Sequence, residues 1–492
     1  MKSLSRILVL ILALGMLASC SSSAPEQNDA ADTGTITTAA DAAAATEETR
    51  ILPNLPVGVT FNGEDFRFLH WEVVAWGVNN SKDLVAESEN GDLINDAVYR
   101  RNTKIEDTYD VKLVVQYMGH DQLIANYTKL VTSSDVAYEV IYPHIATSGS
   151  LVSNGSYYDL TKLPHVDFTQ PWWDQASVED LSIDNRLFFV ASDINTMDDD
   201  ATACMVFNKK LADDYNLPDL YELVKSEKWT FDAMLDTTKD VAGDLNGDSV
   251  MDGSDRYGIV SQMDFAQAFY LGAASSFAEK DADDLPYDSF FNERNIAVCE
   301  KILDIMYDRN NFLNTHVANK NGMSFGNPFV EGRTLYNFSF LGGINSLRQF
   351  EVDFGILPVP KYDDAQESYL SSISSHNTAF ITVPVIHDNP EKVGYILEAM
   401  AAESKYTLIP AYYDLNLISK GLRDEQSEEM LDIIVNQRVF DLGDIFGFGG
   451  FAETWLYMTY YDQRDIASLY EKNAKKITKD IEKFVEKVLE LE

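Results

Sequence analysis

Cysteine is scarce in this chain, and its scarcity argues against a fold held together by disulfides. Three cysteines occur among 492 residues, at positions 20, 204 and 299. Exported domains that depend on disulfides carry a dense cysteine framework, which three residues cannot supply. Cys204 lies in an apolar, strand-like run and Cys299 in a helix-like run, so we expect both to be small buried hydrophobes. Whether these two pair with each other stays open.

Basic residues are also few. The chain has 38 Lys and Arg against 79 Asp and Glu, which gives a formal net charge of −41. Nucleic-acid binding needs Lys and Arg side chains that release counterions from phosphates. The composition therefore argues against a nucleic-acid partner, and solubility is the simplest reason for the acidic excess.

The apolar run near the N-terminus is too short to cross a membrane. Residues 7–17, "ILVLILALGML", follow Lys2 and Arg6 and lead into small residues that end at Cys20. A membrane-spanning helix needs about 20 apolar residues, so the pattern predicts a cleaved export signal over residues 1–19. The tetrapeptide "LASC" resembles the bacterial lipoprotein cleavage box, which implies a lipid on Cys20. An ordinary signal peptide cut near Ala18 is the alternative.

Aromatic residues are missing from residues 20–50, which are rich in Ser, Ala, Thr and acidic side chains. Such a segment cannot bury enough apolar surface to fold, so we interpret it as a flexible tether. The body that begins at Ile51 is too long for one hydrophobic core and suits two or three lobes. We expect a cleft between lobes.

Common catalytic motifs are absent. The chain contains no phosphate-binding glycine loop followed by Lys-Ser/Thr, no His-Glu-x-x-His, no Gly-x-Ser-x-Gly and no Cys-x-x-Cys. None of the seven histidines lies four residues from another, which disfavours a zinc site. The sequence therefore predicts a protein that is not an enzyme.

Residues 244–255, "DLNGDSVMDGSD", have the ligand spacing of an EF-hand calcium loop. The turn-forming glycine of position 6 is replaced by Ser249, and the last ligand is the short Asp255. The loop resembles the dockerin variant, but it occurs once and not in tandem, so cohesin binding is not expected. We expect a structural calcium ion, and the alternative is a polar turn that binds nothing. The expected ligands are Asp244, Asn246, Asp248, Asp252, Asp255 and the backbone carbonyl of Val250.

Hydrophobic periodicity predicts an α/β fold. Strand-like runs occur at 66–71, 111–118 and 138–143, with helical spacing of Leu93, Ile94, Ala97, Val98 and Ile105 and a further helix-like stretch at 121–131. This order predicts a parallel sheet. Further strands are expected at 186–193, 203–208, 354–360 and 378–384, and helices at 389–403 and near the C-terminus. The last helix carries one apolar stripe of Ile477, Ile481, Phe484, Val485 and Val488.

The order of several motifs resembles the extracellular solute-binding proteins of ABC importers, in particular the sugar-binding group that includes maltose-binding protein. The carrying stretches include "NDAVYRRNTKIEDTYDVKL", "YEVIYPHIATSGSLVSNGSYYDLTK", "PWWDQ", "SDINTMDDDATACMVFNKKL", "WTFDAMLDTTKDV", "FGILPVPKY" and "NTAFITVP". The resemblance implies a two-lobed periplasmic-binding-protein fold of type II with hinge crossings. The first lobe would comprise 51–197 and 361–410, and the second lobe 198–360 and 411–492.

The same resemblance implies a monomer that captures a carbohydrate, in particular an oligosaccharide, and delivers it to an ABC permease. It would be lipid-anchored on the outer face of the cell membrane, or periplasmic if the cell has an outer membrane. Capture of a peptide or another polar solute stays open, as do a glycan-tethering and a glycan-degrading surface lipoprotein. Sugars are held by aromatic faces and by acidic or amide groups, although this chain offers Phe and Tyr where relatives place Trp. The residues expected to contact the solute are Trp71, Trp76, Tyr142 and His144 from the first lobe, Asp198, Asp199 and Asp200 from the hinge, and Phe265, Phe269, Tyr270, Phe338, Phe340, Phe446 and Phe448 from the second lobe.

Overall fold

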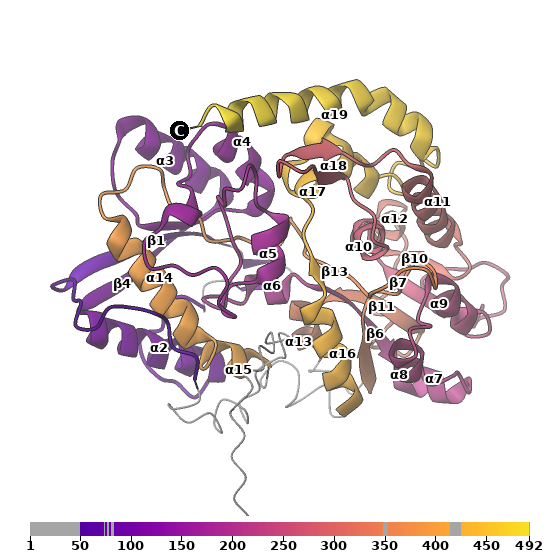
Figure 1. Ribbon diagram of the computed structural model, residues 1–492. Coiled ribbons are helices and arrows are strands. Elements are labelled where there is room, and N and C mark those ends of the chain that lie inside the picture. Colours follow the sequence, from indigo (N-terminus) through magenta and orange to yellow (C-terminus); the bar gives the residue numbers. More distant parts are fainter. Residues whose placement is uncertain are drawn as a thin grey trace, which may run out of the picture. The chain divides into compact units, whose positions relative to one another are not determined.

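The computed structural model describes residues 50–72, 74–75, 78–79, 83–347, 353–413 and 425–491, all of which belong to the unit Gly34–Glu492. The export signal, Cys20, the tether over residues 20–49 and Trp76 lie outside the described residues. Figure 1 shows the described part coloured along the chain.

The N-terminal part of the body forms a parallel three-stranded sheet in the order β4-β1-β5. Its strands are β1 (Glu64–Trp71), β4 (Val111–Met118) and β5 (Val140–Tyr142). Phe66 pairs with Leu113 and Phe68 with Val140, in parallel register on the two sides of β1. Both phenylalanines are fully buried, as is usual for a parallel sheet whose two faces are covered. The predicted parallel βαβ arrangement is confirmed.

Helices α2 (Leu93–Tyr109) and α3 (His120–Ser133) connect these strands at the positions that periodicity predicts. The side chain of Asp92 caps α2 by accepting a hydrogen bond from the backbone N–H of Asn95, and Asp110 ends it in the left-handed conformation. Ile94, Ala97, Val98 and Ile105 are buried. Leu93, the first residue of the predicted stripe, is 48% exposed because it lies in the first turn on the solvent side.

A second, five-stranded sheet has the order β10-β7-β11-β6-β12. Strands β10, β7 and β11 are parallel, whereas β6 runs antiparallel to both β11 and β12. The predicted strand 203–208 is confirmed as β6. The prediction of 354–360 was too long, because Pro358 and Pro360 cannot donate ladder hydrogen bonds. The bounds are β6 (Ala203–Asn208), β7 (Tyr257–Ser261), β10 (Phe312–Asn314), β11 (Thr334–Phe340) and β12 (Phe354–Leu357).

The predicted strands 186–193 and 378–384 are wrong as regular strands. Both segments make isolated bridges, in which Val190 pairs with Ile381, and Thr382 pairs with Ile141 of β5. Residues 379–384 change partner every one or two residues, so no continuous ladder can form. Two mutual backbone hydrogen bonds of 2.9 Å nevertheless join Thr382 to Ile141, which returns the chain to the first sheet after the second is complete.

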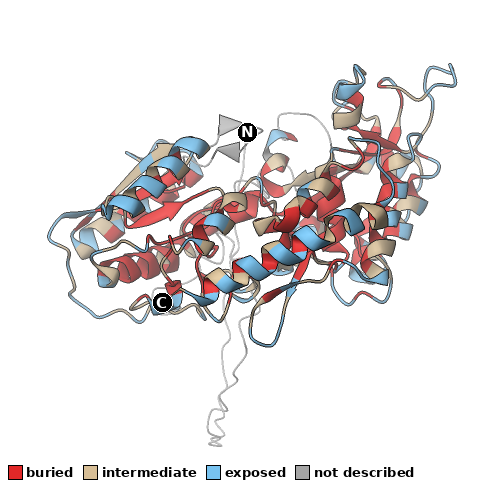
Figure 2. Ribbon diagram, turned by 90° about the horizontal axis from the view of Figure 1, so that it is seen from above, coloured by how far each residue is buried: buried red, intermediate tan, exposed pale blue. Residues whose placement is uncertain are grey.

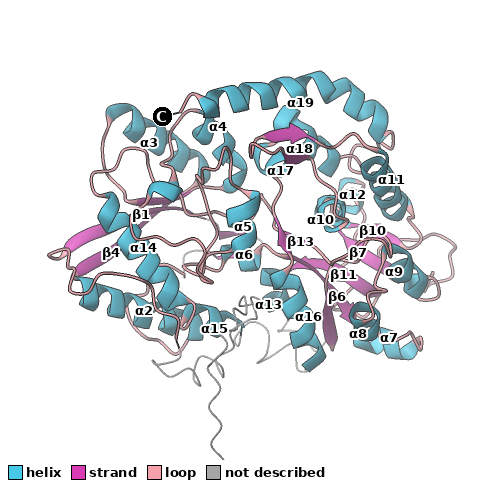
Figure 3. Ribbon diagram, viewed as in Figure 1, coloured by secondary structure: helices cyan, strands magenta, loops and turns pink. Residues whose placement is uncertain are grey.

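Further helices accompany each sheet, and Figure 3 shows how the helices surround the strands. Helices α14 and α15 contact α2, whereas α7, α8, α9, α11, α12, α13 and α16 contact strands of the second sheet. Their bounds are α4 (Ser148–Ser153), α5 (Gln175–Asp180), α6 (Met197–Asp200), α7 (Lys209–Asp214), α8 (Leu220–Lys225), α9 (Phe231–Thr238), α10 (Asp264–Gly272), α11 (Glu293–Tyr307), α12 (Thr315–Lys320), α13 (Leu341–Leu347), α14 (Pro390–Ser404), α15 (Leu408–Tyr413), α16 (Glu425–Asn436), α17 (Leu442–Phe446), α18 (Phe451–Leu456) and α19 (Ile466–Leu489).

Short elements complete the described chain. The two-stranded pairs are β2 (Val74–Ala75) with β3 (Val78–Asn79), β8 (Ala278–Lys280) with β9 (Pro286–Asp288), and β13 (Ser371–Ser372) with β14 (Arg438–Val439). The 3₁₀ helices are η2 (Ile145–Thr147), η3 (Leu160–Lys162) and η5 (Phe448–Gly450).

The C-terminal helix α19 packs by the predicted apolar stripe. Ile477, Ile481, Phe484 and Val488 are buried, and Val485 is half-buried. Figure 2 shows the general pattern, with buried residues inside and exposed residues along the outer faces of the helices. Across the described ranges no helix combines the length and apolar character that a bilayer crossing requires.

Cys204 on β6 and Cys299 on α11 are free and buried, which answers the open question about their pairing. The strands of the first sheet fall within residues 51–197 and those of the second within 198–360. The lobe boundaries themselves stay a prediction.

Candidate functional site

The strongest candidate for a binding surface lies at the carboxyl ends of the first sheet's strands, where open α/β sheets bind ligands. β1 ends at Trp71, and His144 follows β5 after Tyr142 and Pro143. The rings of Trp71 and His144 meet edge to face at 4.5 Å, and the His120 ring lies 5.4 Å from that of His144. His376 arrives from the returning segment, 6.3 Å from His144. We call Trp71, His120, His144 and His376 the histidine rim.

The protonation of His144 follows from its surroundings. Burial lowers its pKa to about 4, so the ring is neutral at pH 7. Nε2 lies 3.0 Å from the backbone carbonyl oxygen of His376, which can only accept, so Nε2 carries the proton. Nδ1 then carries a lone pair, and it is buried with no protein partner. His144 therefore offers a hydrogen-bond acceptor to a hydroxyl group.

Buried polar atoms in the segments that adjoin His144 along the chain and across the Ala379 bridge also lack a protein partner. They include the Tyr142 hydroxyl and Oγ1 of Thr378, the residue directly before Ala379, which bridges to His144. The Tyr142 ring stacks on His70 at 4.8 Å, and burial raises the pKa of the phenol, so it stays protonated. Buried polar groups in folded proteins nearly always have a partner. Each of these atoms therefore leaves a hydrogen bond that a polar ligand or a water molecule can make.

Residues 198–200 are the candidates for a sugar-binding carboxylate. They lie on α6, where they are buried and bonded to side chains from other segments. Arg438 of β14 pairs with Asp198 at 3.0 Å, with Asp174 at 3.3 Å and with Asp199. Tyr413 donates to Asp199 at 2.7 Å, and Tyr412 donates to Asp200 at 2.8 Å. We call Asp174, Asp198, Asp199 and Arg438 the hinge cluster, because it ties segments before and after the second sheet.

The hinge cluster has more acid than base. Burial and the neighbouring Asp199 raise the pKa of Asp198 well above its usual range, although Arg438 opposes the shift. Oδ1 of Asp198 is buried without a protein partner. All three carboxylates are thus bonded to side chains of this chain, Asp198 through its other oxygen to Arg438, and their contact with a solute stays a prediction.

The second group of predicted contacts forms a core rather than a surface. Phe265 and Phe269 are fully buried and stack at 3.7 Å, and Phe338 lies edge-on to both. We call these three rings the phenylalanine core. Tyr270 is fully buried, and its hydroxyl donates to the backbone oxygen of Ser276. Contact of these residues with a solute stays a prediction, and in this structure it would require the core to open.

The other predicted aromatic residues sit at the margins of this core and beside α19. Phe340 is half-buried and packs on Phe338 at 5.3 Å. Phe446 and Phe448 contact each other at 5.7 Å and Phe484 of α19 at 4.6 and 5.5 Å. Phe340 and Phe446 therefore keep some exposed surface, whereas Phe448 is buried.

Two acidic residues on and before α17 were missed by sequence reasoning. Asp444 accepts from Gln267 of α10, and α17 contacts η2, the turn that follows His144. Burial raises the pKa of Asp441 to about 7 and that of Asp444 to about 8. The sequence "DLGDIFGF" carries no signal of this burial, since both residues look like ordinary helix-start acids.

Two buried arginines were also missed. Arg101 is fully buried on α2 and donates to the carbonyl oxygens of Asp83, Leu84 and Ile194 and to Ser404. Its place between Val98 and Ile105 on the buried helix stripe was the available signal. Arg438 lies between Gln437 and Val439, and this context carries no signal that the arginine is buried.

The acidic loop 244–255 shares one backbone feature with a calcium loop. Ser249 at position 6 has φ 66°, the left-handed conformation for which glycine is usual there. The Asp244 carboxylate accepts from the N–H groups of Gly247 and Ser249, and buried Asp255 accepts from those of Leu245 and Asp252. Among the described residues, no group of three or more His, Cys, Asp or Glu side chains is arranged to hold a metal ion. Calcium binding stays a prediction.

Comparison with known proteins identifies the family. Residues 92–403 match the family model "bacterial extracellular solute-binding protein", which covers more than half of the chain. The chain belongs to this family. A search of the curated proteins finds no match.

Solved structures agree on the fold. UspC of M. tuberculosis has a TM-score of 0.55 at 12% identity, covering 85% of this chain and 100% of UspC. A sugar transporter of Rhizobium etli in an open conformation has a TM-score of 0.53 at 12% identity, covering 86% and 100%. An ABC substrate-binding protein of Listeria monocytogenes in complex with cycloalternan has a TM-score of 0.51 at 11% identity, covering 86% and 98%. The protein therefore has the two-lobed fold of periplasmic binding proteins.

Proposed function

We propose that this solute-binding protein captures an oligosaccharide and delivers it to an ABC permease from a lipid anchor at Cys20. The observation that carries the sugar assignment is the histidine rim, where aromatic edges lie beside buried polar atoms without partners. A sugar matches both kinds of group, because it has an apolar C–H face for the aromatic rings and hydroxyl groups for the polar atoms. The Listeria relative, whose structure holds cycloalternan, supports the same solute class.

Binding follows from these groups without bond-making chemistry. The neutral His144 ring accepts a hydrogen bond from a sugar hydroxyl at Nδ1, and Trp71 packs on the sugar face. The Tyr142 hydroxyl is fully buried, so it donates to the sugar only when the packing around it opens. Closure of the second lobe then excludes water from these hydrogen bonds, which strengthens them. The hinge cluster provides a fixed connection about which such closure takes place.

A thermal-shift and calorimetric screen tests the solute class. The exported chain, with Cys20→Ser to prevent acylation, is titrated with maltotriose, maltotetraose, cyclic glucans, monosaccharides and short peptides. Binding of one oligosaccharide class raises the melting temperature by mass action. A shift with peptides alone would show that the solute is a peptide and not a sugar. The absence of a shift with every sugar would refute the proposal.

The anchor is tested separately. Cells that express the wild-type chain should incorporate labelled palmitate into it and retain it in the membrane fraction. The Cys20→Ser chain should lose both, and palmitate incorporation into that variant would overturn the assignment to Cys20.

We also propose that residues 244–255 bind a structural calcium ion. Calcium should raise the melting temperature of the wild type and not that of Asp244→Asn with Asp248→Asn. Equal behaviour of the two proteins would leave the loop as a polar turn.

A further inference from the structure

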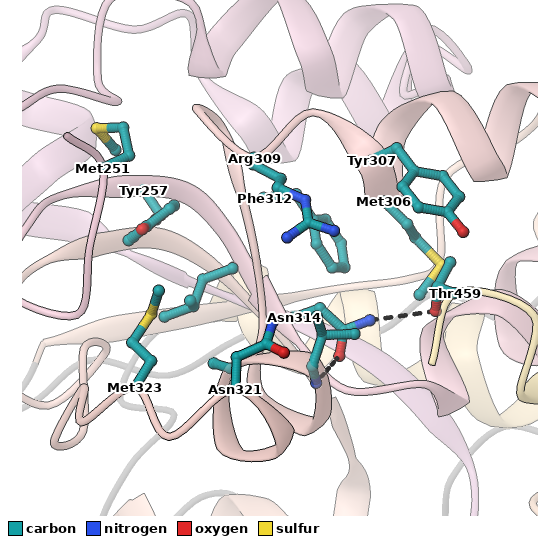
Figure 4. Close-up of a pocket in the computed structure, with 13 residues that line it drawn as sticks. Met251, Tyr257, Met306, Tyr307, Arg309, Phe312, Asn314, Asn321, Met323 and Thr459 are labelled. Atoms are coloured by element: carbon teal, nitrogen blue, oxygen red, sulfur yellow. Dashed lines mark hydrogen bonds between the residues drawn. The ribbon is translucent and has the colours of Figure 1, made fainter. Parts of the chain in front are cut away.

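A cavity of about 140 Å³ lies beside β10, the edge strand of the second sheet. Figure 4 shows residues of its lining, which come in part from α11, α12, β7 and β10. The acidic loop adds Met251, and the turn after α18 adds Thr459. Neither the histidine rim nor the hinge cluster takes part in this lining.

The walls of the cavity suit a flat apolar ring. Three methionines, Met251, Met306 and Met323, lie around it together with the rings of Tyr257 and Phe312. Thioethers adapt to irregular shapes and make favourable contacts with aromatic rings. A dry cavity of about 150 Å³ holds one benzene molecule, so this volume matches a single ring. Polar side chains, among them Tyr307, Asn321 and Thr459, complete the lining beside this apolar part.

One end of the cavity carries a cation. Figure 4 shows the Arg309 side chain reaching over Phe312 toward the middle of the lining group. Its ion pair with Asp462 is long, 3.9 Å, and both side chains are more than half exposed, so the pair is weak. Asn314 is engaged elsewhere, since it accepts from the Val317 N–H and donates to Thr459. Arg309 is therefore the lining group best able to hold an anionic substituent.

We propose that this cavity is a second ligand site, distinct from the solute site, and that it takes a small aromatic carboxylate. The ring lies among Met251, Met306 and Met323, and the carboxylate pairs with the Arg309 guanidinium, the planar donor that suits it best. The site does not depend on the identity of the transported solute.

Methionine-methyl NMR tests the site directly. The exported chain carrying Cys20→Ser and labelled at its methionine methyl groups is titrated with sodium benzoate and, in parallel, with uncharged benzyl alcohol. Ring-current shifts should appear at Met251, Met306 and Met323 and not at Met400 or Met430, which are buried on α14 and α16. Shifts confined to other methionines, or none at millimolar benzoate, would overturn the proposal.

Two variants separate the ring site from the charge. Val317 lines the cavity and is half-buried on the short helix α12, so Val317→Phe should fill the cavity and abolish the shifts from both probes while the melting temperature is kept. Arg309→Gln should weaken benzoate about fivefold, the range of an exposed ion pair, and leave benzyl alcohol unchanged.

The matched control is Arg464→Gln, which removes an exposed arginine that stacks on Tyr307 but does not line the cavity. It should leave both probes unchanged. Equal weakening of benzoate by Arg309→Gln and Arg464→Gln would mean a diffuse charge effect and would refute the carboxylate assignment. Unchanged shifts in Val317→Phe would refute the cavity itself.

Discussion

The histidine rim and the phenylalanine core are both aromatic clusters near strands of a sheet. They differ in whether their atoms find all their contacts within the protein. In the phenylalanine core every ring is buried against another ring, and Phe265 and Phe269 have no exposed surface. In the histidine rim the rings are partly exposed, and Nδ1 of His144 is buried without a partner. A core completes its own contacts, whereas a binding surface leaves some for a ligand. The following predictions test this distinction.

Removal of a ring from the phenylalanine core should produce the largest loss of stability. We expect Phe269→Ala to lower the free energy of unfolding by about 3–5 kcal/mol, because it leaves a cavity among Phe231, Phe265 and Phe338. Urea denaturation measures the loss. A loss below about 1 kcal/mol together with weaker solute binding would mean that Phe269 belongs to the binding surface.

The hinge cluster should respond nearly as strongly. Arg438→Met leaves the carboxylates of Asp174, Asp198 and Asp199 buried without their cation, which costs about 3 kcal/mol. The loss should shrink at pH 5, because burial raises the pKa of Asp198 well above its usual range and its protonation removes one of the buried charges. Arg100→Met is the control, since its ion pair with Glu89 is exposed and contributes less than about 1 kcal/mol. Equal losses at pH 5 and pH 8 would contradict an electrostatic role.

Asp444 should make stability fall as pH rises. Its folded pKa is raised to about 8 by burial, whereas an unfolded aspartate has a pKa of about 4. The stabilising contribution is complete below the unfolded pKa and is lost progressively up to pH 8, by at most about 1.4 kcal/mol per pH unit.

Asp444→Asn keeps an oxygen acceptor for Gln267 and removes the titration. Chemical denaturation between pH 5 and pH 8 should show a flatter stability profile for this variant, and the gain over wild type should grow with pH. Glu482→Gln on α19, whose side chain is exposed, should leave the profile unchanged. If Asp444→Asn keeps the same dependence of stability on pH as the wild type, other groups cause that dependence.

The sequence predicted more of the fold than of the candidate site. Apolar runs and helical spacing predicted β1, β4, β5 and β6 together with α2 and α19. The two helices bury one periodic stripe, whereas β5 and β6 are buried along their whole length. The returning segment 378–384 was misjudged as a strand, since its partners lie in three different parts of the chain and only the fold brings them together. The buried Arg101 and Arg438 were missed because burial of a charge depends on acceptors that are distant in sequence.

Residue type also misled the site prediction. Phe265, Phe269 and Tyr270 follow β7 just as Trp71 ends β1 and His144 follows β5, so position along the chain cannot separate a core ring from a binding ring. Exposure and unpartnered polar atoms do separate them, and both come from the packed structure. His120 and His376 were likewise identified only from the packed structure, because neither lies in a sequence motif.

Trp71 should give the smallest change in stability and a specific change in binding. Its ring is half-buried, packs against the main core and contacts His144 edge to face, so Trp71→Ala should lower the free energy of unfolding by about 1–2 kcal/mol, less than Phe269→Ala. A stacking ring lost from a sugar site should weaken maltotetraose binding about tenfold, equivalent to about 1.4 kcal/mol. Calorimetry on the variant measures the affinity, and Trp71→Phe should restore most of it, because a flat face remains. Weaker binding in the alanine variant with rescue by phenylalanine requires an aromatic surface in contact with the solute, whereas the same change in Phe269→Leu would erase the difference between rim and core.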